Sequence, residues 1–307
     1  MDLSIIIPAY NRLWSLPETI DSCRGGSCLK EIIVIDDGST DGTYEWLNKQ
    51  NDLVSLRQDH LGKCWAVNKG FQLAKGRYIR FLDADDLLHE AANEEQVKLG
   101  KLTSADIVVS GYQTFSNLKQ PLKKQLWIET DDFISQQLGE CDSSHYSAYL
   151  FKRSFIENIP HRPDFAFRDD RLFVLEAALK SPEVAIHKGT ALLHRVHHAD
   201  RLQLSGGLKQ DVQNFQHLQI YKYILHRLGI EGRLTKRRIN AALKIIWPLA
   251  HWIAKCHPDE ANEVVNWIYT LDPDFSIPDR GLLGMLYRHL GFKNTERLLK
   301  LRRTLIT

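Results

Sequence analysis

The chain is poor in several features that would assign it to a large class of proteins. Cysteine is scarce, with five residues scattered among 307, which argues against a disulfide framework and for reduced thiols in the cytoplasm. No run reaches the roughly 18 consecutive apolar residues that a membrane-spanning helix needs. The first residues contain neither a basic leader nor a small-residue cleavage site, so we expect a strand there and not a signal peptide.

An excess of one charge and a glycine-rich phosphate loop are also lacking. The formal net charge is only +2, which makes nucleic acid an unexpected partner. No G-x-x-x-x-G-K precedes a Ser or Thr, and no G-x-G-x-x-G follows the first strand-like run. These absences disfavour a P-loop nucleotidase and a dinucleotide oxidoreductase. If the chain handles phosphates, oxygen ligands on Mg²⁺ or Mn²⁺ would serve in place of a glycine loop.

The chain does contain short apolar runs that alternate with helical patterns over its first two hundred residues. Residues 3–7, 32–35 and 78–82 form clear runs, and residues 107–109 form a weaker one. Runs of this length suit strands that are buried on both faces. The alternation predicts an α/β fold, a mainly parallel sheet sandwiched by helices.

Polar residues follow each of the three clearest runs. In open α/β sheets, ligands bind beyond the carboxyl ends of the strands, so three such ends together indicate a site. An ordinary turn with a helix cap would also explain the acids after the second run. The side chains concerned are Tyr10 and Asn11 after the first run, Asp36 and Asp37 after the second, and Asp83 and Asp85 after the third.

The third of these loops, Asp-Ala-Asp-Asp at residues 83–86, is the most acidic. Three carboxylates directly after a buried strand repel one another, and a divalent cation would remove that repulsion. A solvated turn is the alternative. We therefore expect a divalent metal at this loop.

Four segments resemble the motifs of a known family. They are SIIIPAYNR at residues 4–12, IIVIDDGSTDGT at 32–43, the run from Gly62 to Gly76, and YIRFLDADD at 78–86. In this order and spacing they resemble family 2 glycosyltransferases, whose fold is the Rossmann-like GT-A fold. The resemblance covers residues 3–115. It continues more weakly to residue 205, through FRDDRLF at 167–173 and HRVH at 194–197.

The resemblance implies an inverting transferase that moves a hexosyl or N-acetylhexosaminyl group. The donor would be a nucleoside-diphosphate sugar, most often a UDP-sugar. The acceptor would be a hydroxyl on a growing surface glycan or a lipid-linked oligosaccharide, and Mn²⁺ or Mg²⁺ would assist. Through the resemblance, the site residues are Pro8, Tyr10, Asn11, Asp37 and Asp83 for the nucleotide, Asp85 and His197 for the metal, Asp170 as general base, and Asp169 and Trp127 near the acceptor.

Three positions depart from the family pattern. His194 stands in place of a Tyr, His60 in place of an Asn, and Asp169 in place of a Glu. The histidines at 194, 197 and 198 form only a weak zinc signal, because no Cys or second cluster accompanies them. Trp127 could stack on a sugar ring, and ordinary packing is the alternative that explains such a residue.

Helical periodicity replaces the strand signals in the last hundred residues. We expect a catalytic domain over residues 1–205 and a helical domain over 206–307, with Pro248 kinking or splitting one helix. Residues 281–307 carry a net charge of +5, which leaves −3 for the rest of the chain. A basic segment rich in leucine could hold the protein at the inner face of the cytoplasmic membrane. A solvated helix that packs its leucines on the domain is the alternative.

Two other function classes fit parts of the sequence. A nucleotidyltransferase shares the α/β architecture, but an early phosphate loop rich in Gly and Lys is missing. A non-catalytic sugar-nucleotide-binding protein would be favoured by replaced acids at positions 85 and 170, and both positions hold Asp. An active glycosyltransferase is therefore the preferred interpretation.

Overall fold

The computed structural model describes residues 1–116, 120–196 and 207–306. The chain forms two compact units, and the second takes a short segment from the middle of the sequence. The domain boundary expected between residues 205 and 206 lies outside the described residues. The first unit is Met1–Phe133 with Asp142–Asp200, and the second is Ile134–Cys141 with Arg201–Thr307.

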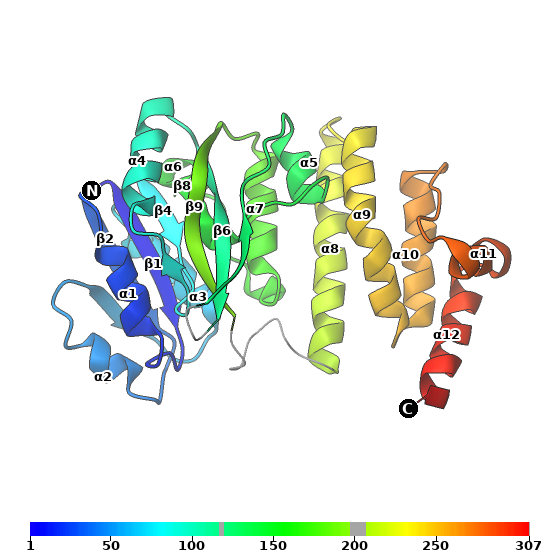
Figure 1. The fold of residues 1–307 in the computed structure, drawn as a ribbon, viewed down its shortest axis with the longest axis horizontal. Helices are drawn as coiled ribbons and strands as arrows, with labels where there is room; N and C mark the ends of the chain where they lie inside the picture. Colours follow the sequence, from blue (N-terminus) through cyan, green and yellow to red (C-terminus); the bar gives the residue numbers. More distant parts are fainter. Residues whose placement is uncertain (117–119, 197–206, 307) are drawn as a thin grey trace. The chain divides into compact units, whose positions relative to one another are not determined.

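The first unit is built on one mixed sheet. Its strands are β1 (Leu3–Ala9), β2 (Lys30–Asp36), β3 (Val54–Arg57), β4 (Tyr78–Phe81), β5 (Leu87–Leu88), β6 (Ile107–Ser116), β7 (Pro121–Gln125), β8 (Leu150–Lys152) and β9 (Val184–Val196). Their order is β3-β2-β1-β4-β8-β6-β9-β5, and β7 pairs with β6 (Figure 1). The strands β3, β2, β1 and β4 are all parallel. In the other half only β6 and β9 pair in parallel.

Helices cover both faces of this sheet. They are α1 (Leu16–Arg24), α2 (Thr43–Leu47), α3 (Lys63–Leu73), α4 (Ala92–Thr103), α6 (Arg153–Ile156) and α7 (Asp169–Leu179), with the short 3₁₀ turns η1 (Tyr146–Ala148) and η2 (Pro163–Phe165). Along β1, Ile5 packs in the core that α1 and α4 cover, whereas Ile6 packs in the core that α3 and α7 cover. Burial on both faces explains the unbroken apolar run. The predicted α/β sandwich is confirmed.

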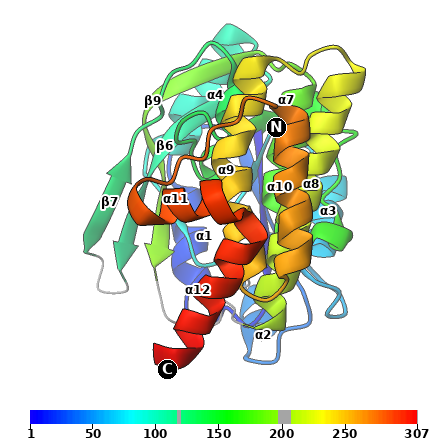
Figure 2. The same cartoon turned by 90° about the vertical axis from the view of Figure 1, so that its right-hand side faces the viewer.

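The second unit is entirely helical where it is described. Its helices are α5 (Phe133–Leu138), α8 (Leu208–Ile230), α9 (Lys236–Ala254), α10 (Pro258–Leu271), α11 (Gly281–Leu290) and α12 (Phe292–Ile306). Helix α9 packs against α8 and α10, and α12 packs against α10 and α11 (Figure 2). Pro248 does not split its helix, because α9 continues through it. At the end of α5 the Leu138 carbonyl accepts a hydrogen bond from the Tyr221 hydroxyl, and beyond this helix Glu140 pairs with Arg237.

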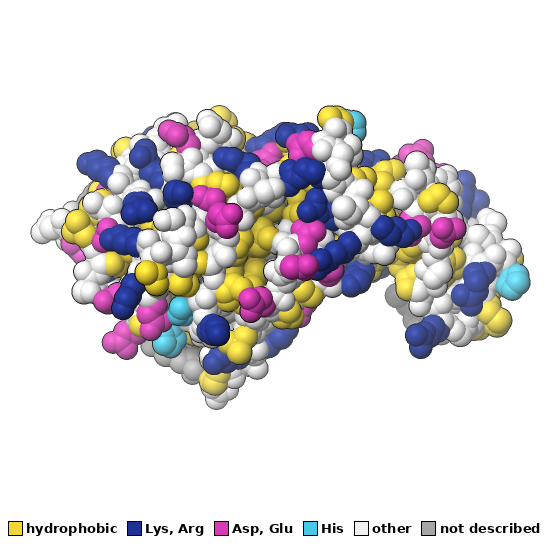
Figure 3. All heavy atoms as spheres, turned by 90° about the horizontal axis from the view of Figure 1, so that it is seen from above, with side chains coloured by type: hydrophobic (Ala, Val, Ile, Leu, Met, Phe, Trp, Pro, Cys, Tyr) yellow, Lys and Arg dark blue, Asp and Glu magenta, His cyan; other side chains and the backbone are white. Residues whose placement is uncertain are grey.

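Two surface properties bear on the sequence-based expectations. Among the described residues, no helix combines the length and the apolar character needed to cross a membrane. On the face drawn in Figure 3, Lys and Arg side chains alternate with Asp and Glu side chains. Charges of both signs are therefore interspersed on that face.

Candidate active site

The carboxyl ends of β1, β2 and β4 lie at the same edge of the parallel half of the sheet. Ala9, the last residue of β1, pairs with Asp36, the last residue of β2. Tyr10, Asp37 and Asp83 therefore emerge from neighbouring strand ends, as the sequence predicted. The structure brings together polar side chains that lie up to about seventy residues apart in the chain.

The carboxylate of Asp37 is buried and receives donors from one loop. Its Oδ1 accepts hydrogen bonds from the Leu61 backbone N–H at 2.9 Å and from Gln58 Nε2 at 2.7 Å. Its Oδ2 accepts from the Gly62 backbone N–H at 3.0 Å and lies 2.9 Å from His60 Nδ1. Asp37 thus fixes the loop of residues 58–62 that leads into α3.

Tyr10 and Asn11 directly follow Ala9, whose carbonyl accepts a hydrogen bond from the Asp37 N–H. The Tyr10 ring stacks on the His60 imidazole, with centroids 3.9 Å apart and planes inclined by 21°. Asn11 has a left-handed backbone (φ 50°), and its Oδ1 accepts from the Thr40 N–H at 2.8 Å. Asn11 therefore ties the loop after β1 to the loop after β2. Pro8 precedes these residues within β1 itself.

The acids of the 83–86 loop have separate partners. Asp83 Oδ1 lies 2.8 Å from Lys63 Nζ, and Asp85 Oδ2 lies 3.4 Å from Arg12 Nε. Both carboxylates remain partly exposed. Burial acts to raise the pKa of Asp83, but Lys63 together with His145 and His194 outweighs burial and lowers that pKa to about 2.

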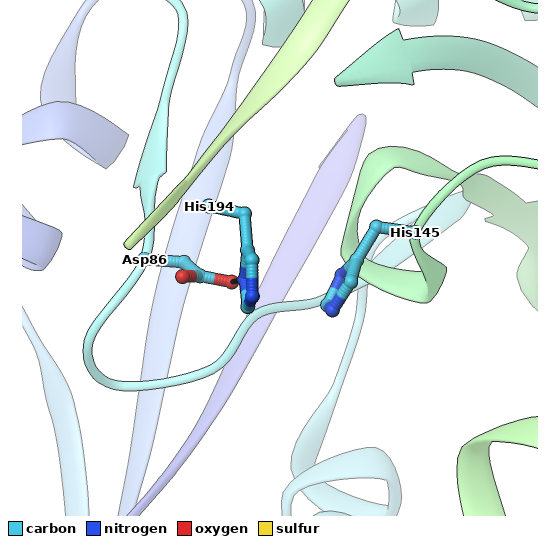
Figure 4. Close-up of side chains that lie close together, drawn as sticks. All are labelled: Asp86, His145 and His194. Carbon is cyan, nitrogen blue, oxygen red and sulfur yellow. Dashed lines mark hydrogen bonds and ion pairs between the residues drawn. The ribbon is translucent and has the colours of Figure 1, made fainter. Parts of the chain in front are cut away.

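Asp86, the last acid of this loop, is fully buried and belongs to a cluster with two histidines (Figure 4). Its Oδ2 lies 3.0 Å from His194 Nδ1, and the His194 ring stacks on the His145 ring at 4.6 Å. The three residues offer ligand atoms within 4.8 Å of one another. Burial lowers the pKa of His145, which keeps its imidazole neutral. His197, the predicted metal ligand, lies outside the described residues.

The acidic pair at the start of α7 is divided between two environments. Asp169 Oδ2 lies 2.8 Å from His161 Nδ1, and His161 Nε2 lies 2.7 Å from the Tyr146 hydroxyl. Asp170 Oδ2 lies 3.1 Å from Lys63 Nζ. Its other oxygen, Oδ1, is buried and has no hydrogen-bond partner among the described residues. Asp169 is thus held by His161, whereas Asp170 is held at one oxygen by Lys63.

Electrostatics separates the two acids further. Burial raises the pKa of Asp170 to about 6, with help from Asp169 and Asp83 and against the Lys63 ammonium. Burial also acts to raise the pKa of Asp169, but the His161 contact together with the Lys63 ammonium and Cys64 outweighs burial and lowers that pKa. One member of the pair therefore titrates near neutral pH and the other stays ionised. This division suits a proton acceptor beside a fixed negative charge.

Lys63, His161, Tyr146 and His145 were not identified from the sequence as parts of this network. Lys63 directly follows Gly62 in a run that the resemblance includes. Its position at the start of a predicted helix was the only feature of the sequence that could have drawn attention to it. The contacts of His161 and His145 leave no local pattern. Trp127, expected near the acceptor, packs against Phe133 and Tyr149.

Several proteins with a named activity are similar to this chain in sequence. One relative is the poly(ribitol-phosphate) beta-N-acetylglucosaminyltransferase TarP of Staphylococcus aureus. It is 34% identical over 201 residues, which are 60% of this chain and 59% of that protein. The matched part is thus less than two thirds of the relative's length.

Solved structures share the fold. The crystal structure of S. aureus TarS 1-349 in complex with UDP-GlcNAc has a TM-score of 0.58 at 14% identity, covering 99% of this chain and 92% of that one. The mannosyltransferase PcManGT of Pyrobaculum calidifontis, in complex with GDP-Man and Mn²⁺, has a TM-score of 0.53 at 16% identity, covering 97% and 86%. The mixed sheet with its helical layers is therefore the GT-A fold.

The sequence model of one family matches residues 4–159, about half of the chain. This segment contains β1, β2 and β4 with the acidic loops that follow them. With the fold and the ordered strand ends, the match places this chain in glycosyl transferase family 2.

Proposed function

We propose that the chain transfers a sugar from a UDP-sugar to an acceptor hydroxyl, with inversion at the anomeric carbon, and that the first unit is the catalytic one. The Asp170 carboxylate carries this proposal. One of its oxygens is buried without a partner among the described residues, and the other is linked through Lys63 to Asp83 of the 83–86 loop. TarP, named an N-acetylglucosaminyltransferase, and TarS, solved with UDP-GlcNAc, support this reaction class.

Asp170 acts as the general base. In an inverting displacement the acceptor hydroxyl attacks the anomeric carbon from the side opposite the leaving diphosphate, and its proton must be removed as the bond forms. A carboxylate with a pKa of about 6 is ionised at neutral pH yet still basic enough to take that proton. The Asp170 carboxylate takes that proton, and Lys63 contacts its Oδ2.

The nucleotide binds at the ends of β1 and β2. Tyr10 supplies an aromatic surface for the base. Asp37 supports the surface by fixing the 58–62 loop, which carries the stacked His60. Asn11 holds the neighbouring loops together. The diphosphate then extends toward Asp83.

The acidic loop suits a divalent cation. Asp83 and Asp85 present partly exposed carboxylate oxygens, the ligand type that Mg²⁺ and Mn²⁺ prefer. These two residues would hold the metal, with His197 as a further ligand. When bound, the metal supplies positive charge that stabilises the departing nucleoside diphosphate. PcManGT was solved with Mn²⁺.

Replacement of the base tests the proposed reaction. With a UDP-sugar and Mn²⁺, Asp170→Asn should bind UDP as the wild type does, while turnover falls by about 10² to 10⁴. Asp164→Asn changes an exposed acid that pairs with Arg162 and is the matched control. Wild-type turnover in Asp170→Asn would overturn the assignment of the base. UDP binding without any turnover in the wild type would instead favour a non-catalytic binding protein.

The acceptor is a glycan polymer or a lipid-linked oligosaccharide, and the second unit reaches a membrane surface through α12. Leu298 and Leu301 on this helix are exposed, at 49% and 61%, and Arg297 and Lys300 flank them. Such a face suits an anionic lipid surface.

Vesicle sedimentation tests this contact. With vesicles containing anionic lipid, the combined variant Leu298→Ser, Leu301→Ser and Lys300→Glu should sediment less than the wild type. Leu208→Ser changes an exposed leucine of α8 and is the control. Equal sedimentation of all three proteins would remove α12 from membrane binding.

A further inference from the structure

Three side chains of a metal-ligand type come together in the first unit, and the proposed reaction uses none of them. They are Asp86, His145 and His194, whose ligand atoms lie within 4.8 Å of one another (Figure 4). Two imidazoles and one carboxylate form a donor set that suits Zn²⁺ or Co²⁺. The zinc signal of residues 194–198 was weak because a second group of ligands was missing from the sequence pattern, and the fold supplies that group.

Strand pairing brings two of these ligands together. Strand β5 runs antiparallel to β9, with Leu87 opposite Leu193. One step further along this register Asp86 meets His194, and Asp86 Oδ2 lies 3.0 Å from His194 Nδ1. His145 directly precedes η1, which packs against β9. The three ligands therefore come from the 83–86 loop, from β9 and from the segment before η1.

The distances are close to those of a four-coordinate zinc site. Two ligand atoms that are each about 2.0–2.1 Å from a tetrahedral ion lie roughly 3.3 Å from each other. Asp86 Oδ2 and His194 Nδ1 are already near this separation. The rings of His145 and His194 are stacked, with centroids 4.6 Å apart and planes inclined by 29°. A small movement of the His145 ring would therefore bring a nitrogen to the same ion.

The buried carboxylate favours a cation at this place. Asp86 Oδ1 accepts a hydrogen bond from the Arg195 backbone N–H at 2.9 Å. The Arg195 guanidinium itself donates to Glu18 and to the Asp85 carbonyl. The charge of Asp86 is thus met by a backbone amide and an imidazole. A divalent ion would add a full opposite charge to a carboxylate that has been removed from water.

An ion can approach this group past the imidazoles. The His194 side chain is 24% exposed, whereas the Asp86 side chain is fully buried. His145 Nδ1 accepts a long hydrogen bond of 3.3 Å from the Ser147 backbone N–H, so this nitrogen holds a lone pair. Ligation through it would exchange that hydrogen bond for a metal bond. Water would complete the coordination from the exposed side.

We propose that these three side chains form a transition-metal site, separate from the Mg²⁺ or Mn²⁺ site proposed at Asp83 and Asp85. Imidazole ligands favour Zn²⁺ and Co²⁺ over Mg²⁺, which prefers oxygen ligands and keeps several waters. His194 stands where the family pattern has a Tyr, so the site is a property of this chain. The inference goes beyond the proposed function, because the ion would join three segments of the first unit whether or not a sugar nucleotide is bound.

Cobalt binding tests the site without substrate. The full chain, without a histidine tag and stripped of metal by a chelator, is titrated with Co²⁺ in excess Mg²⁺, which occupies sites made of oxygen ligands. The wild type should bind one equivalent with a visible absorption band typical of four- or five-coordinate cobalt, and Zn²⁺ should displace it. The lack of a saturable band in the wild type would overturn the inference.

Ligand variants locate the bound ion. His194→Tyr, which introduces the residue of the family pattern, and His145→Gln should each weaken Co²⁺ binding by at least about tenfold. His226→Gln changes an exposed histidine of α8 and is the matched control, with binding as in the wild type. Undiminished binding in His194→Tyr and His145→Gln would indicate an adventitious surface ion and contradict the proposal.

Asp85→Asn distinguishes the two metal sites. It removes a ligand of the oxygen site and should leave the cobalt band unchanged. A loss of the band as large as that in His194→Tyr would place the histidines in one site with the other acids of the 83–86 loop, and the inference of a separate site would fail. Failure of the proposed function, seen as absent turnover with a UDP-sugar and Mn²⁺, would leave the cobalt result unaffected.

Thermal unfolding guards against a variant that simply fails to fold. Zn²⁺ should raise the Tm of the wild type, because an ion that binds only the folded state stabilises it. His145→Gln should unfold near the wild-type temperature in the presence of a chelator, yet show no rise when Zn²⁺ is added. An equal rise in both proteins would show that the ion binds elsewhere, and the proposed site would be wrong.

Discussion

Two sides of the candidate site hold their acids by different means. The donor side is formed by the loops after β1, β2 and β4, and the base side by Asp169 and Asp170 at the start of α7 with their partners. On the donor side, backbone N–H groups of Leu61 and Gly62 contribute to holding Asp37. On the base side, the long side chains of Lys63 and His161 hold the pair at the start of α7. Backbone donors follow from the path of the chain, and every substitution at their own positions except proline keeps them. The base side depends on individual side-chain charges and is therefore the more easily tuned.

The largest expected difference between the two sides is their response to pH. Turnover should fall about tenfold for each pH unit below 6, because protonated Asp170 cannot take the acceptor proton. The affinity for an intact UDP-sugar should change far less, since the pKa of Asp83 is about 2. Turnover and titration calorimetry, each measured from pH 5 to 8, compare the two. Parallel losses would show that both sides titrate together.

Removal of the buried donor-side acid should cost stability. Asp37→Ala leaves the Leu61 and Gly62 N–H groups without their acceptor, and we expect the free energy of unfolding to fall by about 1–3 kcal/mol. UDP affinity should fall as well, because the 58–62 loop loses its anchor. Denaturant unfolding measures the stability, and the exposed Asp59 offers Asp59→Ala as a control. An unchanged unfolding midpoint would contradict the structural role of Asp37.

The smallest expected effect concerns the outer part of the base side. Tyr146→Phe removes the hydroxyl that contacts His161 and should lower the free energy of unfolding by about 1 kcal/mol. Turnover should remain close to that of the wild type, because Asp169 keeps its own contact with His161. A large loss of turnover at unchanged stability would extend the catalytic machinery to Tyr146.

The donor side was largely predictable from the sequence. A buried parallel strand leaves an apolar run, and a polar segment follows it, so the placement of Tyr10, Asp37 and Asp83 at one edge of the sheet could be predicted, while their roles stay predictions. The role of Asn11 differs in kind, because its side-chain oxygen holds Thr40. The conformation of the 58–62 loop could not be foreseen, because it depends on a carboxylate more than twenty residues away.

The base side was predictable only in part. Asp170 was identified through a family resemblance, but its partner Lys63 lies 107 residues earlier in the chain. No periodicity or spacing reports such a contact, because it arises when α3 and α7 pack on the same face of the sheet. The stacked rings of His145 and His194 were hidden for the same reason.

The short helix α5 has a practical consequence for anyone who wishes to dissect the protein. The segment Ile134–Cys141 leaves the sheet-containing unit, joins the helical one, and the chain then returns. Truncation after residue 205 would leave this segment without its contacts to Tyr221 and Arg237. An exchange of the helical unit between relatives should therefore include Ile134–Cys141 together with the C-terminal helices.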